Sequence, residues 1–442
     1  MLQSFGNIDN YTDADLISAV QFEEKGNFLA TGDRGGRVVL FKQEPRDEDD
    51  DDEDEESEQD KFSRNLSSHS RSSVATRTRE PQWVPMYQFQ SHQAEFDYLK
   101  SLEIEEKINN IKFVPSAGCM QLLSSNDKTI KLWRIGNRSV QRYQPTNLGS
   151  KANKAEFSKR SYRSDGGGAA VVLPRLEDEH TELIATSKKE FKNAHAYHIN
   201  SLSVNTDGET FLSADDLRII WWNLDVDNHC FNVVDLKPNN MEELKEVITC
   251  AKFHPISCNQ LVYATSRGAL RIVDTRDSAL GDTPSVSFEA PDDTNSFYSE
   301  VTASVSDVKY SRCGNMLCSR DYMTVKVWDV RSNHAPLQVI EVQENLKPNL
   351  SELYENDCIF DKFEVNFSSD GKKVLTGLYD NKGMIDLAHP FTTSALTSTI
   401  CLTPYNKHPI PRSECVGCQR RGHGAVARHQ ALYTGQQQPQ RT

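Results

Sequence analysis

The chain has 442 residues, of which 26% are charged and 37% hydrophobic, and its formal net charge is −14. This length suits one large all-β domain or two to three ordinary domains. Ten consecutive acidic residues, Asp47 to Glu56, supply most of the net charge, so a fold-wide basic patch is not expected and nucleic acid is disfavoured as the main ligand.

The N-terminal segment MLQSFGNIDNYTDADL lacks the basic and then apolar pattern of a signal peptide. The sequence also lacks an apolar run of about 18 residues, the length that a membrane-spanning helix requires. We therefore expect a soluble intracellular protein with no membrane partner.

Six segments of the chain share one pattern. Each has an alternating apolar strand, a turn with Gly, Asn or Asp, a second strand that ends in small residues, a tight polar turn and a third alternating strand. In chain order they span residues 17–41, 108–133, 199–222, 248–274, 305–329 and, with a weaker match, 360–386. A three-stranded unit cannot bury both of its apolar faces, so the copies must stack radially into a ring. The sequence therefore predicts an all-β fold, a WD40-type β-propeller.

Particular residue types recur at fixed places in these repeats. Trp133, Trp222 and Trp328 lie at the ends of third strands, where we expect them to pack between neighbouring blades. Small residues such as Ser124-Ser125 and Ser213-Ala214 end the second strands. They suit the crowded middle of a sheet that packs face to face with its neighbours.

Three segments interrupt or follow the repeats. Residues 43–82 join the acidic run to a Ser/Arg-rich stretch and are predicted to be a disordered loop, either a solvated linker or a site for basic proteins. Residues 136–193 are predicted to form a projecting arm. The propeller would thus span residues 1–390, and residues 391–442 would form a divergent, disordered tail.

No enzymatic motif is present in the sequence. There is no nucleotide-binding loop and no nucleophile elbow, so we expect neither catalytic residues nor a cofactor. In the tail, Cys415, Cys418 and His423 resemble an incomplete zinc knuckle, and no metal site is expected. Four histidines are isolated along the chain and are expected to be structural: His92, His195, His198 and His254. Three cysteines in apolar stretches are expected to be reduced core thiols: Cys250, Cys313 and Cys318.

Several longer motifs exceed what a generic propeller needs. They lie at residues 89–113, 193–205, 213–219 (SADDLRI), 235–249, 319–329 and 353–364. From about Phe5 to Tyr379 the chain closely resembles the B-type, 55-kDa, WD-repeat regulatory subunit of serine/threonine protein phosphatase 2A. The resemblance implies a seven-bladed propeller without enzymatic activity of its own. A protein of this kind binds the HEAT-repeat scaffold subunit, recruits phosphoprotein substrates to the catalytic subunit, and would be located in the cytoplasm and nucleus.

The resemblance also implies a substrate platform on the top face of the ring. Its residues would be Tyr197, Asp216, Glu242, Leu244, Phe297, Tyr298 and Lys362. These residue types fit the role, because Asp216 and Glu242 can pair with Lys or Arg that flanks a phosphosite, while Leu244 and the aromatic residues offer apolar anchors. The alternative for Asp216 is a structural one, since an Asp in a polar turn commonly accepts hydrogen bonds from backbone amides.

The chain departs from the family pattern in three places. The arm matches poorly in detail, the acidic insertion after the first hairpin has no counterpart, and no seventh copy of the repeat follows Tyr379. An unclosed ring would leave sheet edges and an apolar blade face in water. Two alternatives therefore stay open: a propeller adaptor that binds basic peptides without the phosphatase, or a non-functional truncated isoform.

Overall fold

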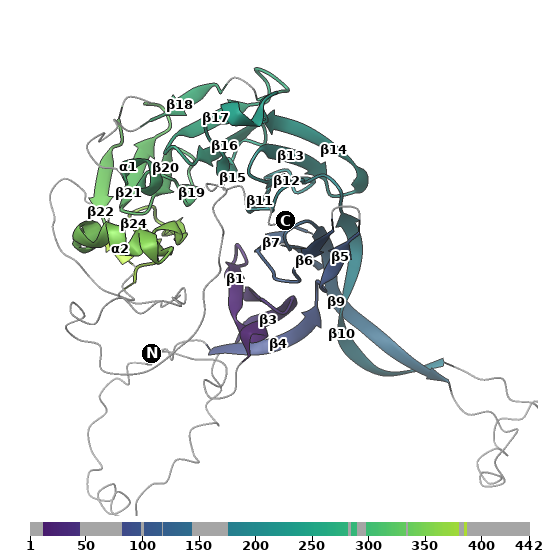
Figure 1. Cartoon of the computed structure of the whole chain (residues 1–442). Helices are drawn as coiled ribbons and strands as arrows, with labels where there is room; N and C mark the ends of the chain where they lie inside the picture. The colour runs from purple at the N-terminus through teal and green to yellow at the C-terminus, as the bar shows by residue number, and fades with distance from the viewer. Residues whose placement is uncertain are drawn as a thin grey trace, which may run out of the picture.

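The computed structural model describes residues 12–44, 82–98, 101–116, 118–143, 176–281, 284–289, 298–332, 335–379 and 384–386. Within these ranges the chain forms five four-stranded antiparallel sheets and one three-stranded sheet, each built from strands that are consecutive in the chain. Figure 1 shows the sheets arranged around a common centre, with β1, β7, β11, β15 and β19 as inner strands. The predicted all-β propeller is confirmed.

The blades follow the predicted repeats. Blade 1 contains β1 (Ile17–Phe22), β2 (Phe28–Asp33), β3 (Arg37–Glu44) and β4 (Gln82–Gln90); blade 2 contains β7 (Asn110–Val114), β8 (Met120–Ser125), β9 (Ile130–Tyr143) and β10 (Leu176–Phe191). Blade 3 contains β11 (Ser201–Val204), β12 (Thr210–Ala214), β13 (Arg218–Asn223) and β14 (Val226–Asp235); blade 4 contains β15 (Ile248–Phe253), β16 (Gln260–Thr265), β17 (Leu270–Asp274) and β18 (Val286–Phe288). Blade 5 contains β19 (Asp307–Tyr310), β20 (Met316–Arg320), β21 (Thr324–Asp329) and β22 (Gln338–Glu341).

The sixth repeat forms the three-stranded sheet, with β23 (Val365–Phe367), β24 (Lys373–Thr376) and β25 (Met384–Asp386). The described residues form no seventh blade, so the seven blades implied by the resemblance stay a prediction. Shorter elements lie in the connections: the hairpin β5 (Glu95–Asp97) and β6 (Leu102–Ile104), the 3-10 helices η1 (Asp13–Asp15), η5 (Met241–Glu243), η6 (Glu344–Asn349) and η7 (Cys358–Phe360), and the α-helices α1 (Ser299–Thr302) and α2 (Leu350–Glu355). None of the helices in the described ranges is long and apolar enough to cross a membrane.

Backbone hydrogen bonds between blades define one face of the ring. The turn between the second and third strands of a blade accepts a bond from the residue that leads into the next inner strand. Ile108 N donates to Asp33 O at 3.1 Å, Ile199 N to Asp127 O at 3.0 Å, and Ile248 N to Asp216 O at 2.8 Å. We call the side that carries these turns and connections the top face. Turns between first and second strands lie on the opposite face, because successive strands are antiparallel.

The core lies between the blades. Trp222 of blade 3 packs with Phe211 and with Phe191 of blade 2, and the Trp222 and Phe191 ring centroids are 5.3 Å apart. Trp328 of blade 5 is fully buried against Phe288 of blade 4. The predicted packing of the tryptophans between blades is confirmed.

The small residues of the second strands also have a polar role that their size did not predict. The indole N–H groups of Trp133, Trp222 and Trp328 each donate to a buried serine hydroxyl of the same blade. The distances are 3.1 Å for Trp133 to Ser124, 2.8 Å for Trp222 to Ser213 and 3.0 Å for Trp328 to Ser319. Burial of a tryptophan N–H without an acceptor would be costly, so the serines allow the tryptophans to be buried.

The cysteine prediction is correct for two residues and wrong for the third. Cys250 and Cys318 are free and buried, whereas Cys313 is exposed. Cys313 lies in the turn between β19 and β20, where its Sγ is 3.3 Å from the Ser311 hydroxyl. A position in a turn faces solvent even when the flanking strands are apolar.

The hairpin of β9 and β10 extends beyond its blade. From Ile130 to Ile135, β9 pairs with both β8 and β10. From Gly136 onward it pairs only with β10, to the pair of Tyr143 and Leu176. Figure 1 shows these two strands running together away from the ring. Residues 144–175, which include the rest of the predicted arm, lie outside the described residues, as do most of the acidic loop and the C-terminal tail.

Candidate functional site

The structure places the predicted platform residues in connections and turns of the top face. Tyr197 lies between β10 and β11, Asp216 between β12 and β13, and Lys362 just before β23. Glu242 and Leu244 lie in and directly after η5, between β14 and β15, and Tyr298 precedes α1. Phe297 lies outside the described residues.

Two adjacent aspartates in the turn of blade 3 have different surroundings. Asp215 is fully buried, and its Oδ1 accepts hydrogen bonds from the backbone N–H groups of Leu217 and Arg218 at 2.8 and 2.7 Å. Its Oδ2 is 2.9 Å from Nδ1 of His195. The side chain of Asp216 has no hydrogen-bond partner among the described residues. The structural role that the sequence left open for Asp216 is therefore performed by Asp215, and the Asp216 carboxylate is free to bind another group.

Asp216 interacts electrostatically with Lys362 across the ring. Partial burial raises the pKa of Asp216, and the positive charge of Lys362 is the largest opposing influence. Desolvation lowers the pKa of Lys362, while the negative charge of Asp216 raises it. Because Asp216 belongs to blade 3 and Lys362 precedes the sixth sheet, the two side chains must both face the centre of the top face to influence each other.

His198 lies beside this group, and it also bonds to the neighbouring blade, as expected of a structural histidine. Its side chain is 52% exposed, and Nδ1 is 3.0 Å from Oδ2 of Asp127 in the adjacent turn of blade 2. Asn109 donates to the other carboxylate oxygen of Asp127 at 2.6 Å. The hydrogen bond that His198 donates to Asp127 is the main cause that raises the pKa of His198, and the charge of Asp216 contributes in the same direction. His195 and His254 are structural, as predicted, since both bond within or between blades.

The His198 and Asp127 pair gives a direct titration prediction. We expect NMR to show a pKa for His198 above the ordinary 6.5 of histidine. Replacing Asp127 with Asn should lower it, because the amide lacks the negative charge. The raised pKa contributes stability below the unfolded pKa, and this contribution is lost as the pH rises through the folded value. A pKa of His198 that is the same in both proteins would contradict the ion pair.

Glu242 and Leu244 offer contrasting groups on a capped turn. The side chain of Asn240 accepts a hydrogen bond from the backbone N–H of Glu242 at 3.2 Å, which caps η5. Glu242 is exposed, whereas Leu244 is partly buried. The turn therefore presents a carboxylate to solvent beside an apolar side chain.

Tyr298 belongs to a separate aromatic part of the top face. Its ring centroid is 5.8 Å from that of Tyr354 in α2, and it packs on the buried cluster around Leu353 and Phe363. Tyr354 is 41% exposed. The top face thus carries a charged group around Asp216 and, apart from it, an aromatic surface beside blades 5 and 6.

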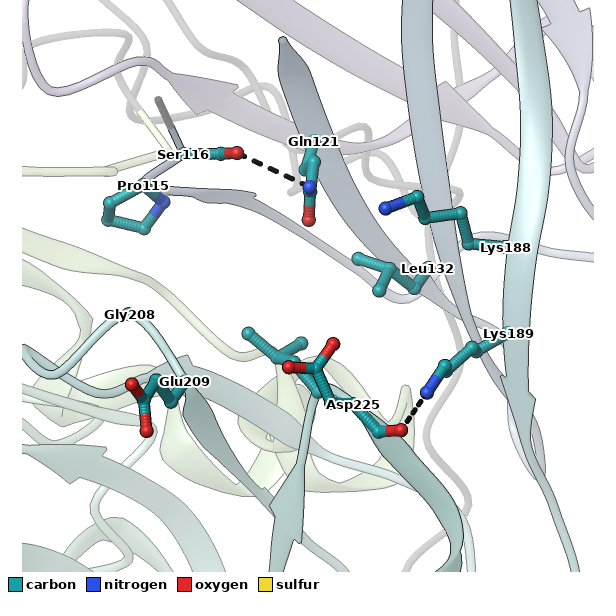
Figure 2. Close-up of a pocket in the computed structure, with 10 residues that line it drawn as sticks. Pro115, Ser116, Gln121, Leu132, Lys188, Lys189, Gly208, Glu209 and Asp225 are labelled. Atoms are coloured by element: carbon teal, nitrogen blue, oxygen red, sulfur yellow. Dashed lines mark hydrogen bonds between the residues drawn. The ribbon is translucent and has the colours of Figure 1, made fainter. Parts of the chain in front are cut away.

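A cleft of about 180 Å³ lies between blades 2 and 3 on the opposite face, beside the base of the arm. It is lined by Pro115, Ser116, Gln121, Leu132, Lys188, Lys189, Gly208, Glu209, Leu224 and Asp225. Figure 2 shows the ammonium group of Lys189 pointing to the backbone carbonyl of Asp225. Among the residues that the structure describes, no three His, Cys, Asp or Glu side chains gather to hold a metal ion. Cys415, Cys418 and His423 lie outside these residues.

The fold and the site define a β-propeller whose loops gather charged and apolar groups on one open face, which is the architecture of a protein-binding subunit. No protein-family model matches the chain. It is 47% identical over 383 residues to the B-type regulatory subunit of protein phosphatase PP2A of Candida tropicalis, covering 86% of this chain and 68% of that protein. It is 45% identical over 379 residues to the protein of the same name from Schizosaccharomyces pombe, covering 85% and 74%.

A third relative, from Arabidopsis thaliana, is the beta isoform of the B-type 55 kDa regulatory subunit of serine/threonine protein phosphatase 2A. It is 42% identical over 433 residues, which cover 92% of this chain and 83% of the relative. The chain belongs to the family of B-type regulatory subunits of protein phosphatase 2A. The predicted family is confirmed, and the members of this family are regulatory rather than catalytic.

Proposed function

We propose that this chain binds the scaffold subunit of protein phosphatase 2A and positions phosphoprotein substrates for the catalytic subunit. The observation that carries the proposal is the convergence of Asp216, Lys362 and His198 at the centre of the top face. The free Asp216 carboxylate and the exposed Glu242 suit substrates with Lys or Arg beside the phosphosite. Such binding accelerates dephosphorylation because it makes the encounter with the catalytic subunit effectively intramolecular.

The proposal is tested by mixing the full chain with the scaffold and catalytic subunits and separating the products by size exclusion. We expect a stoichiometric complex of three chains. A chain that elutes alone and still binds basic peptides would instead be a propeller adaptor, and the proposal would be wrong. Aggregation of the chain in the presence of both subunits would equally contradict a working regulatory subunit.

The arm offers a sharper test of scaffold binding. Replacing residues 137–183 with a short Gly-Ser linker removes the part of the hairpin that pairs only with itself and retains all pairs within blade 2. We propose that this hairpin, which extends beyond its blade, is the main scaffold contact. We therefore expect scaffold affinity in surface plasmon resonance to fall at least about tenfold, or ~1.4 kcal/mol. The thermal unfolding midpoint should stay close to that of the parent. Unchanged affinity would place the scaffold contact elsewhere on the chain.

A further inference from the structure

Three inner strands carry a lysine at the same position of the repeat. The aligned residues in successive inner strands are Gln21, Lys112, Ser203, Lys252, Lys309 and Asn366. In β7, β15 and β19 the residue before each lysine is buried in the apolar core: Ile111, Ala251 and Val308. Because side chains alternate along a strand, the three lysines point away from that core and share one position along the axis of the ring.

The contacts of two of these lysines cross from one inner strand to the next. The ammonium group of Lys112 donates to the side chain of Gln21 in β1. That of Lys252 donates to the backbone carbonyl of Leu202 in β11 at 3.1 Å. Lys309 pairs with Asp307 of its own strand at 3.4 Å. The three ammonium groups therefore lie along the inner edges of the blades.

The charges of Lys309 and Lys252 both reach Lys112. Burial lowers the pKa of Lys112 to about 7, and the charges of Lys309 and Lys252 lower it further than the nearby acids Glu364 and Asp307 raise it. Lys112 is therefore held near two like charges at an energetic cost, which a bound anion would reduce.

The acids of the axis neutralise only part of this cluster. Burial lowers the pKa of Lys309, but the charges of Asp307 and Glu364 raise it above its ordinary value. Asp307 is buried, and its oxygens already accept hydrogen bonds from Cys250 Sγ at 3.3 Å and from the backbone N–H of Val365 at 3.1 Å. Two carboxylates, Asp307 and Glu364, stand against three ammonium groups. An ammonium has three N–H donors, and within the described residues each of these lysines uses one contact, so donors remain for a ligand.

We propose that the inner strands bind a small polyvalent phosphate anion through Lys112, Lys252 and Lys309. Lysine is a compact point charge that suits phosphate oxygens, and several lysines around one axis favour an anion with more than one phosphate group. The lysines are only partly accessible, with 19% of the Lys309 side chain exposed. This accessibility fits a small ion and not a folded partner.

The test measures binding of tripolyphosphate, ATP and inositol hexakisphosphate to the full chain by calorimetry. We expect saturable binding with one site, and at least tenfold weaker binding by Lys112→Met and by Lys252→Met. The matched control is Lys25→Met, which removes a charge from the exposed turn between β1 and β2 and should leave binding unchanged. Equal affinity for tripolyphosphate and ATP would show that the site recognises the phosphate chain alone. Tighter binding of ATP would show that the site also recognises the nucleoside. Both results support the phosphate site.

A second measurement uses the parent chain and does not depend on the folding of a variant. An amine with a pKa of about 7 reacts readily with an acylating reagent at neutral pH, so Lys112 should be modified early and the bound anion should protect it. Mass spectrometry reports the modification of Lys112 and of Lys25 with and without tripolyphosphate. Three results would overturn the proposal. The first is that no probe binds at millimolar concentration, and the second is that the Lys112 and Lys252 variants bind the probes as tightly as the parent. The third is that Lys112 is modified equally with and without the anion.

Discussion

Replacing Asp216 with lysine is expected to lower kcat/KM of the assembled phosphatase for substrates with basic flanks by roughly tenfold to a hundredfold. This loss corresponds to one charge-assisted contact, about 1.5–3 kcal/mol. The reason is that the Asp216 carboxylate has no hydrogen-bond partner among the described residues. Because it lies at the centre of the top face, a Lys or Arg of the substrate can form an ion pair with it. The new lysine would also repel that cation and Lys362.

Two variants separate the charge effect from damage to the fold. Asp216→Asn keeps the shape of the side chain and should show a smaller loss, because it removes the attraction without adding repulsion. Glu24→Lys makes the same charge reversal on an exposed turn of the opposite face and should leave kcat/KM unchanged. Scaffold affinity should be equal in the Asp216 variants and the parent. If Asp216→Lys dephosphorylated basic-flanked substrates as fast as the parent, Asp216 would not belong to the platform.

Replacing Trp328 with alanine is expected to have the largest effect on stability. The indole is fully buried between blades 4 and 5, its ring centroid is 5.7 Å from that of Phe288, and its N–H donates to Ser319. Truncation of a buried tryptophan costs about 3–5 kcal/mol through lost burial and the remaining cavity. It would also leave the Ser319 hydroxyl without its donor. The midpoint of unfolding in urea should therefore fall sharply.

A graded series makes this prediction specific. Trp328→Phe keeps most of the apolar contact and loses only the N–H, so its midpoint should lie between those of the parent and of Trp328→Ala. Trp83→Ala is the matched control, because Trp83 lies on the outer strand β4 and is only partly buried. Equal losses for Trp83→Ala and Trp328→Ala would mean that the interface between blades 4 and 5 is not the main source of stability.

The blades could be predicted because the repeat encodes them locally. Alternation, small residues and polar turns fix strands and their faces without knowledge of distant contacts. The hydroxyl contacts of Ser124, Ser213 and Ser319 could not be predicted in this way. They depend on a tryptophan nine residues later in the chain, which the strand pairing places opposite the residue two positions before each serine.

The site is harder to predict, because adjacent residues of one type are not equivalent in space. Asp215 and Asp216 are both aspartates in the same turn, and only the backbone conformation decides which of them accepts the amide hydrogen bonds. The sequence does not reveal the role of His198, because its partner Asp127 belongs to another blade. The exposure of Cys313 is equally hidden, because its apolar neighbours mask the turn in which it lies. Contacts between blades are thus the part of the site that a single sequence does not show.

The strands β9 and β10 connect the arm mechanically to loops of the top face. At sixteen residues and roughly 3.3 Å per residue, β10 spans about 50 Å of stiff backbone. The turn with Asp127 comes just before β9, and Tyr197 and His198 follow just after β10. A sideways force on the outer part of the hairpin is therefore transmitted along the hydrogen-bonded strands to the loops that hold His198 beside Asp127. A partner that binds the arm would therefore also load the top-face loops that contain Asp127 and His198.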